Sequence, residues 1–278
     1  MKPAAFAYVR ADSVAHAVEL LQEDADNARV LAGGQSLGPM LNLRLARPAT
    51  LIDIKRVPSL RALEADDRVM RVGACWTHAE IEDCVVEDAT RGLLPAVARG
   101  IAYRAIRNRG TVGGSLAHAD PAADWIAAMA VLGADIIVHG PDNTVRRCGA
   151  DSFVRAGFTT DLGRAEVIAA IEVPRLSPAA RWGYYKLCRK RGEFATAIGA
   201  VVLDNAGGIA RVLCGATAGA PLLMPATAAR LAEAGADAAI AAVADEIATL
   251  LTHENAASHH LYVVAVRRAL RQLAAWTA

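Results

Sequence analysis

Apolar positions in the N-terminal part of the chain alternate between helical spacing and short continuous runs. Helical spacing predicts a helix over residues 13–23 with Ser13 as its N-cap. Four apolar side chains share one face of that helix: Val14, Ala17, Val18 and Leu21. Short apolar runs predict strands over residues 29–32 and 50–54, and leucines one turn apart predict a short helix over 39–46. The order of these elements predicts a compact α/β unit.

The middle of the chain predicts further strands over short apolar runs. These runs cover residues 69–75, 134–139 and 167–174. Between the first two runs the pattern becomes helical. A helix capped by Thr77 is predicted to continue through Ile81.

Two longer helices are also predicted in this middle region. An apolar helix is expected over residues 93–105. The other is expected to begin with Asp120 as its cap and Pro121 at its first position, and to run to Leu132. Gly133 then ends that helix.

The C-terminal part of the chain predicts a hairpin followed by helices. Strands are expected over residues 197–203 and 210–216, with a turn over 205–208. The alanine-rich tail keeps leucine, isoleucine and valine at helical spacing, which predicts helices over residues 225–251 and 258–276.

Composition favours a folded protein without a nucleic-acid partner. The chain has 278 residues, of which 54% are hydrophobic and 21% are charged, and its net charge is +1. The longest apolar region, residues 125–138, contains Gly133 and Asp135 and is too short to cross a bilayer. The N-terminus carries no apolar run of signal-peptide length. We therefore expect a cytoplasmic protein with no integral membrane segment.

The cysteines argue against a metal centre built by this chain alone. There are five of them, widely scattered and without a C-x-x-C pair: Cys75, Cys84, Cys148, Cys188 and Cys214. We expect no metal site here. If the protein handles electrons, its iron–sulfur centres must lie on another chain.

Two short segments with adjacent glycines carry the clearest chemical signal. The first glycine segment contains Ala32, Gly33, Gly34, Gln35 and Ser36; the second contains Thr111, Val112, Gly113, Gly114 and Ser115. Glycine pairs let backbone N–H groups face a ligand without a Cβ in the way, and successive N–H groups form an anion-binding nest. Two nests could hold the two phosphates of one dinucleotide. Neither segment matches the Rossmann or P-loop fingerprint.

Two acidic residues follow the second glycine segment closely. A carboxylate would repel a phosphate, so Asp120 and Asp124 are better suited to accept hydrogen bonds from sugar or ribityl hydroxyls. The alternatives are a helix cap for Asp120 and a solvated first-turn acid for Asp124.

These segments, together with three further motifs, resemble the FAD-binding medium subunit of the molybdenum hydroxylases, the carbon monoxide dehydrogenase and xanthine dehydrogenase family. The motifs occur in one order over nearly the whole chain. They are 32–37 (AGGQSL), 43–48 with 51–54 (LRLARP, LIDI), 110–124 (GTVGGSLAHADPAAD), and 171–174 leading to 184–186 (IEVP, YYK).

The resemblance implies an α+β fold in three parts. Two N-terminal α/β FAD-binding subdomains, of the type found in vanillyl-alcohol oxidase-like flavoproteins, would cover residues 1–56 and 57–176. A C-terminal domain of a sheet packed by helices would cover residues 177–278.

The resemblance also implies roles for single residues. The two glycine segments would bind the FAD pyrophosphate, and Asp124 would contact the FAD. Ile101 would lie against the flavin, Leu162 near the cofactor and Lys186 near the isoalloxazine ring. Ser115 stands where many relatives have asparagine or aspartate, and serine reaches less far.

Lys186 has a plain alternative as a solvated strand lysine. Beside a flavin its charge would favour the reduced state and raise the reduction potential. The cationic run that Lys186 forms with Arg189, Lys190 and Arg191 could instead face a partner subunit.

The function implied is electron transfer in a heteromeric oxidoreductase. A small [2Fe–2S] subunit would deliver electrons from a large molybdopterin subunit, the FAD would pass them to an external acceptor, and the complex would be a dimer of heterotrimers. No catalytic nucleophile or base is expected in this chain. The alternatives are a stand-alone FAD-dependent NAD(P)H oxidoreductase and a scaffold whose glycine turns are structural.

Overall fold

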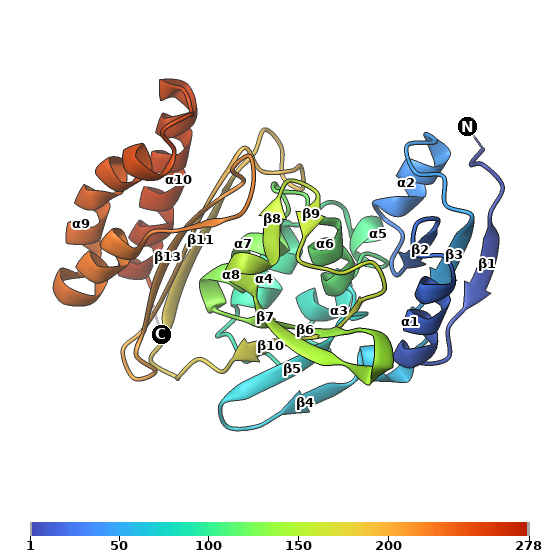
Figure 1. Cartoon of the computed structure of the whole chain (residues 1–278). Helices are drawn as coiled ribbons and strands as arrows, with labels where there is room; N and C mark the ends of the chain where they lie inside the picture. The colour runs from blue at the N-terminus through green and yellow to red at the C-terminus, as the bar shows by residue number, and fades with distance from the viewer. Residues whose placement is uncertain (1, 277–278) are drawn as a thin grey trace.

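Three main β-sheets, each with its own helices, follow one another along the chain in the computed structural model (Figure 1). The structure describes residues 2–276. The N-terminal sheet lies on one side of the second sheet and the C-terminal sheet with its two long helices lies on the other (Figure 1). The arrangement is the expected mixture of helices and strands.

The N-terminal sheet has three parallel strands. Their order is β1-β3-β2, with bounds β1 Ala7–Arg10, β2 Ala28–Leu31 and β3 Thr50–Asp53. Helix α1 (Val14–Glu23) connects the first two, and its four predicted apolar side chains are buried. Ser13 caps it as predicted, because its hydroxyl accepts a hydrogen bond from the backbone N–H of His16 at 3.0 Å.

Helix α2 (Leu37–Asn42) is shorter than predicted and begins earlier. Its start follows the first glycine segment directly, and Pro39 lies in the first turn, where a missing N–H costs nothing. The helix ends because Arg44 takes a left-handed conformation (φ 60°), so the predicted extension to residue 46 is wrong.

The second sheet is antiparallel and has five strands in the order β4-β5-β10-β6-β7. The strands are β4 Leu63–Ala65, β5 Val69–Gly73, β6 Asp135–His139, β7 Val145–Gly149 and β10 Val167–Pro174. The single-turn helices η1 and η2 cover Pro58–Arg61 and Pro141–Asn143. The α-helices are α3 His78–Glu82, α4 Leu93–Gly100, α5 Arg104–Arg107, α6 Val112–His118, α7 Asp124–Leu132 and α8 Ala150–Phe153. A small hairpin follows them, with strands β8 Val154–Ala156 and β9 Thr159–Thr160.

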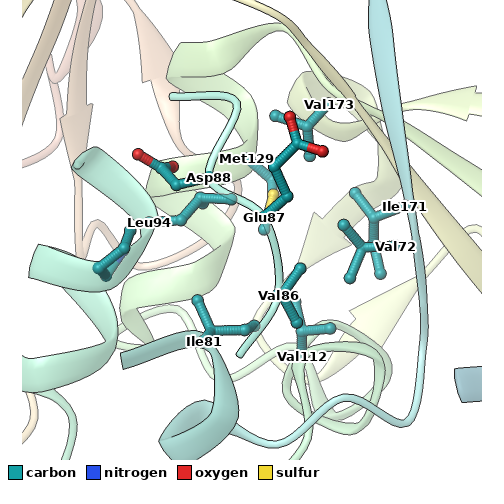
Figure 2. A pocket seen from close by; sticks show the side chains of 11 residues that line it. Val72, Ile81, Val86, Glu87, Asp88, Leu94, Val112, Met129, Ile171 and Val173 are labelled. Carbon is teal, nitrogen blue, oxygen red and sulfur yellow. The ribbon is translucent and has the colours of Figure 1, made fainter. Parts of the chain in front are cut away.

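A cavity lies between this sheet and its helices (Figure 2). Its walls are mostly apolar and include Val72, Val112, Met129 and Ile171. The cavity volume is about 10 Å³, room for about one water molecule. It is therefore a small packing void, too small for a cofactor.

The single apolar helix predicted over residues 93–105 is wrong. Helix α4 ends at Gly100, Ile101 is extended, and Ala102 is left-handed (φ 42°) before α5 begins. Tertiary contacts break the helix here: Ile101 forms a β-bridge with Gly192, and the Arg107 guanidinium donates to the carbonyl oxygens of Ile101 and Ala102 at 2.9 and 3.0 Å.

The predicted start of the next helix is also wrong. Helix α7 begins at Asp124, with Ala123 as its N-cap, rather than at Asp120. The Asp120 carboxylate instead accepts a hydrogen bond from the backbone N–H of Ala122 at 3.0 Å, which forms a turn around Pro121. Asp124 thus occupies the first turn of a helix in which every residue is buried.

The C-terminal sheet is an antiparallel meander in the order β11-β12-β13-β14. Its strands are β11 Arg181–Leu187, β12 Ala197–Asp204, β13 Ile209–Gly215 and β14 Leu222–Leu223. The sequence analysis predicted the β12–β13 hairpin but no separate strand for β11. Helices α9 (Pro225–Leu250) and α10 (Ala256–Ala274) cover one face of this sheet (Figure 1). The prediction of one continuous helix over 225–251 is wrong at Gly235, whose φ of 82° breaks α9 into two helical pieces.

The other face of the C-terminal sheet packs on the second unit. Strand β12 is buried along its whole length, because alternate residues face different partners. Ile198, Ala200 and Val202 join the core that contains α7, whereas Val201 and Leu203 join the core that contains α9 and α10. No helix within the described residues combines the length and hydropathy that crossing a membrane needs.

The close approach of α10 to the sheet depends on glycines without a Cβ. A Cβ added at Gly199 would lie 2.3 Å from the carbonyl oxygen of Ala265 in α10. We expect Gly199→Ala to lower the free energy of unfolding by about 1–3 kcal/mol, the usual cost of overpacking. Chemical denaturation measures this change. Gly38→Ala is the matched control, because no atom lies within 4 Å of the added Cβ, and an unchanged Gly199→Ala variant would contradict the packing argument.

Candidate functional site

The two glycine segments, far apart in the sequence, lie against each other. A Cβ added at Gly33 would lie 2.1 Å from the carbonyl oxygen of Arg109, in the connector that leads into the second segment. A Cβ added at Gly114 would lie 3.7 Å from the Cβ of Ala32. The N-terminal sheet and the second unit therefore meet at these two segments, and the meeting requires glycine at Gly33.

The first glycine segment leaves its backbone donors free. Among residues 2–276, no hydrogen bond is donated by four successive N–H groups, those of Gly33, Gly34, Gln35 and Ser36. Gly34 has a φ of 71°, which a residue with a side chain rarely adopts. Free N–H groups in a half-buried turn suit a phosphate, and the role of this segment as an anion nest stays a prediction.

The second glycine segment differs from the prediction. It forms the start of α6, capped by the Thr111 hydroxyl, which accepts from the Gly114 N–H at 3.1 Å. Three further N–H groups have partners too: Val112 donates to the Trp76 carbonyl, Gly113 to that of Ala74 and Ser115 to that of Thr111. The prediction that this segment forms a second nest of free N–H groups is therefore wrong.

The glycines of the second segment instead permit close packing. A Cβ on Gly113 would lie 2.5 Å from the Cβ of Ala74, at the end of β5. In the described part of the chain the Ser115 hydroxyl has no hydrogen-bond partner. What this segment offers a ligand is a hydroxyl and a backbone that can be approached closely.

A buried histidine that the sequence analysis did not consider anchors the connector between the segments. The His78 N–H donates to the Gly110 carbonyl at 2.9 Å, and the Trp125 indole N–H donates to His78 Nδ1 at 2.9 Å. Burial, with a smaller effect of the Arg107 charge, lowers the pKa of His78 to about 4. His78 is thus neutral at physiological pH. No sequence signal distinguished this histidine from a surface residue.

Asp124 and Lys186 form a buried ion pair. The Lys186 ammonium lies 2.7 Å from Asp124 Oδ2, and the two side chains are 11% and 5% exposed. The Tyr184 hydroxyl donates to Asp124 Oδ1 at 3.0 Å. Burial raises the pKa of Asp124, an effect that Lys186 and Tyr184 partly offset. The alternatives of a solvated acid and a solvated lysine are both wrong.

The ion pair also lies close to Ile101. The Lys186 ammonium also donates to the Gly100 carbonyl at 3.4 Å, one residue before Ile101. Arg107 and the bridge to Gly192 hold Ile101 in its extended conformation. Three predicted residues from different elements, namely Asp124, Lys186 and Ile101, are therefore neighbours.

Leu162 lies at the end of the β8–β9 hairpin. It is half-buried against the main core, and its N–H donates to the Thr160 hydroxyl at 3.2 Å. The hairpin is tied to the end of α6, since the Phe158 N–H donates to the Ala119 carbonyl at 2.8 Å. The role of Leu162 toward a cofactor stays a prediction.

The family model described as the FAD binding domain in molybdopterin dehydrogenase matches residues 4–176, which include both glycine segments. The chain belongs to this family. The match confirms FAD as the cofactor expected from the resemblance. It does not test the role of any single residue.

Relatives with curated names support the same assignment. The chain is 37% identical over 213 residues to the alpha subunit of the 6-hydroxypseudooxynicotine dehydrogenase complex of Paenarthrobacter nicotinovorans, covering 76% of this chain and 72% of the relative. It is 39% identical to the carbon monoxide dehydrogenase medium chain of Hydrogenophaga pseudoflava, covering 74% and 72%. The resemblance to medium subunits of molybdenum hydroxylases is confirmed.

Solved structures agree over the whole length of the chain. The carbon monoxide dehydrogenase of Hydrogenophaga pseudoflava superposes with a TM-score of 0.89 at 34% identity, covering 100% of both chains. Quinoline 2-oxidoreductase of Pseudomonas putida 86 gives 0.87 at 30% identity, covering 99% of both. The fold is therefore that of oxidoreductase subunits of this family, including the C-terminal unit beyond the family model.

The residues present fit an FAD of this family. Four free N–H groups in the first segment suit its pyrophosphate, and the Ser36 and Ser115 hydroxyls have no partner among the described residues. The Lys186 cation is held by the Asp124 carboxylate and the Gly100 carbonyl.

Titration of His78 makes stability depend on pH. Because its pKa is lowered to about 4 in the folded chain, the unfolded chain binds a proton first as pH falls below 6.5. The contribution of neutral His78 to the free energy of unfolding is fully present above pH 6.5 and is lost as pH falls from 6.5 to about 4. This loss amounts to about 3 kcal/mol. Denaturant titrations over this range should show a smaller loss for H78Q. H260Q, at an exposed position, should keep the wild-type loss, and an equal loss in H78Q would contradict this assignment.

Breaking the buried ion pair should destabilise the fold. Asp124→Asn leaves the Lys186 charge buried and uncompensated, so we expect a loss of about 3–5 kcal/mol in the free energy of unfolding. Asp26→Asn is the control, because the Asp26–Arg164 pair is 70% and 78% exposed and should be worth less than about 1 kcal/mol. Equal losses in the two variants would show that the Asp124 pair is not effectively buried.

Proposed function

We propose that this chain is the FAD-carrying electron-transfer subunit of a heteromeric molybdenum hydroxylase. Electrons would arrive from [2Fe–2S] clusters on a small partner subunit, supplied by a large molybdopterin subunit, and leave to an external acceptor. The observation that carries the proposal is the first glycine segment, whose four free N–H groups lie within the FAD-binding family match. Relatives named as medium chains support the assembly with further subunits.

We assign the predicted residues to three parts of the FAD. Ala32, Gly33, Gly34, Gln35 and Ser36 would hold the pyrophosphate through backbone N–H groups. The hydroxyls and carboxylates would serve the sugar and ribityl chain: Thr111, Ser115, Asp120 and Asp124. Val112, Gly113 and Gly114 would let the cofactor approach the backbone, and Ile101, Leu162 and Lys186 would lie near the ring.

The chemistry at this site belongs to the cofactor. When bound, FAD supplies the exchange between one-electron and two-electron transfer. The chain positions it and tunes its potential: the Lys186 cation, fixed by Asp124, favours the more negatively charged reduced state. No side chain of this chain is needed as a nucleophile or base.

The larger assembly and the division of the chain are part of the same proposal. We propose a dimer of heterotrimers in the cytoplasm. We describe the chain as subdomains 1–56 and 57–176 and a C-terminal domain 177–278. The division is supported by the sheets, because one of the three main sheets falls in each part.

Gly114→Val should abolish FAD binding. A Cβ at this position would already lie 2.8 Å from the Thr111 hydroxyl, and the larger side chain would fill the surface beside Ala32. Calorimetric titration of the full chain with FAD measures the loss. Gly38→Val is the matched control, since an added Cβ there has nothing within 4 Å, and it should bind FAD like the wild type.

Circular dichroism would check that both valine variants are folded. If folded Gly114→Val bound FAD at wild-type affinity, the second glycine segment would not be part of the FAD site. A wild-type chain that ignores FAD would refute the proposed function itself.

A further inference from the structure

Tyr184 shares a face of β11 with Lys186. Residues two apart in a strand point to the same side, so both side chains face α7 and the main core. Tyr185, between them, faces the opposite side, where its ring and hydroxyl contact Arg268 of α10. The two adjacent tyrosines therefore belong to different layers of the protein.

Tyr184 donates a hydrogen bond to the Asp124 carboxylate, which in turn binds the Lys186 ammonium. Asp124 Oδ2 accepts from the Lys186 ammonium at 2.7 Å, and Asp124 Oδ1 accepts from the Tyr184 hydroxyl at 3.0 Å. Among residues 2–276, Tyr184 is the only side chain that donates to Oδ1. The hydroxyl also lies 3.4 Å from the Asp124 backbone carbonyl oxygen, so it contacts both the backbone and the side chain of Asp124.

The tyrosine is itself fixed. Its backbone N–H donates to the Gln272 side-chain oxygen of α10 at 2.7 Å, and its strand partner is Ala200 of β12. Burial raises the pKa of Tyr184 well above its usual range, so the phenol keeps its proton and remains a donor. Without this donor, one oxygen of a buried carboxylate, on a side chain that is 5% exposed, would lose its side-chain partner.

We propose that Tyr184 is a positioning residue that fixes the Lys186 ammonium through Asp124 and thereby sets the reduction potential of the bound FAD. The proposal rests on the proposed function, because it needs FAD near Lys186. The Lys186 side chain is unbranched with several rotatable bonds, and its field at a given point depends on where its ammonium is held. Tyr184 restrains that position without needing contact with the cofactor.

A double-mutant cycle tests the proposal on the FAD-loaded full chain. The midpoint potentials of wild type, Y184F, K186M and Y184F/K186M are measured by equilibration with reference redox dyes while FAD absorbance is followed. We expect Y184F to shift the potential to a more negative value. The same substitution should cause no shift in the K186M background, because Tyr184 acts through Lys186.

Y185F is the matched control, since it removes one hydroxyl from the same strand on the opposite face. It should leave the potential unchanged. Should Y184F fail to hold FAD, Y184L, which also lacks the hydroxyl, takes its place in the cycle.

Equal potentials in Y184F and wild type would overturn the proposal, as would an equal shift with and without Lys186. Either result with FAD still bound would leave the proposed function intact. A wild-type chain without bound FAD would instead refute the proposed function.

Discussion

The backbone contact between the first glycine segment and the connector that leads into the second is the constraint on which the site depends. The turn after β2 rests on the carbonyl of Arg109, at a distance that excludes any side chain at Gly33. Next to this contact, the neutral His78 ring accepts a hydrogen bond from the Trp125 indole N–H, and the backbone N–H of His78 donates to the Gly110 carbonyl. The units of the first and second sheets thus meet at this contact, and among the described residues the four N–H groups of the first segment donate no hydrogen bond.

The buried ion pair attaches the C-terminal unit to the second unit. Lys186 belongs to the C-terminal sheet and Asp124 to α7 of the second unit, so their pairing crosses between the two. Burying both charges costs free energy that good geometry must offset, which Tyr184 and the Gly100 carbonyl supply. A buried pair of this kind is weak evidence for stability.

Local patterns predicted the parts of the fold that local interactions determine. The Ser13 and Thr77 caps, the β12–β13 hairpin and the long C-terminal helices follow from short-range signals. The break after Gly100 did not, because it depends on the bridge between Ile101 and the distant Gly192. The late start of α7 was missed because the local turn at Asp120 uses the same Asp-Pro pair that commonly starts a helix. The resemblance pointed to Lys186 as a site residue. Its contacts with Asp124 and Gly100, and the contact of Tyr184 with Asp124, join residues distant in the sequence and became visible only in the structure.

Hydrogen–deuterium exchange with and without FAD tests the central claim most directly. The account predicts that FAD slows exchange of the Gly33, Gly34, Gln35 and Ser36 amides, which donate no hydrogen bond among the described residues. The amides of Val112, Gly113, Gly114 and Ser115 already have protein partners and should change less. Protection confined to the second segment, with none in the first, would contradict the account.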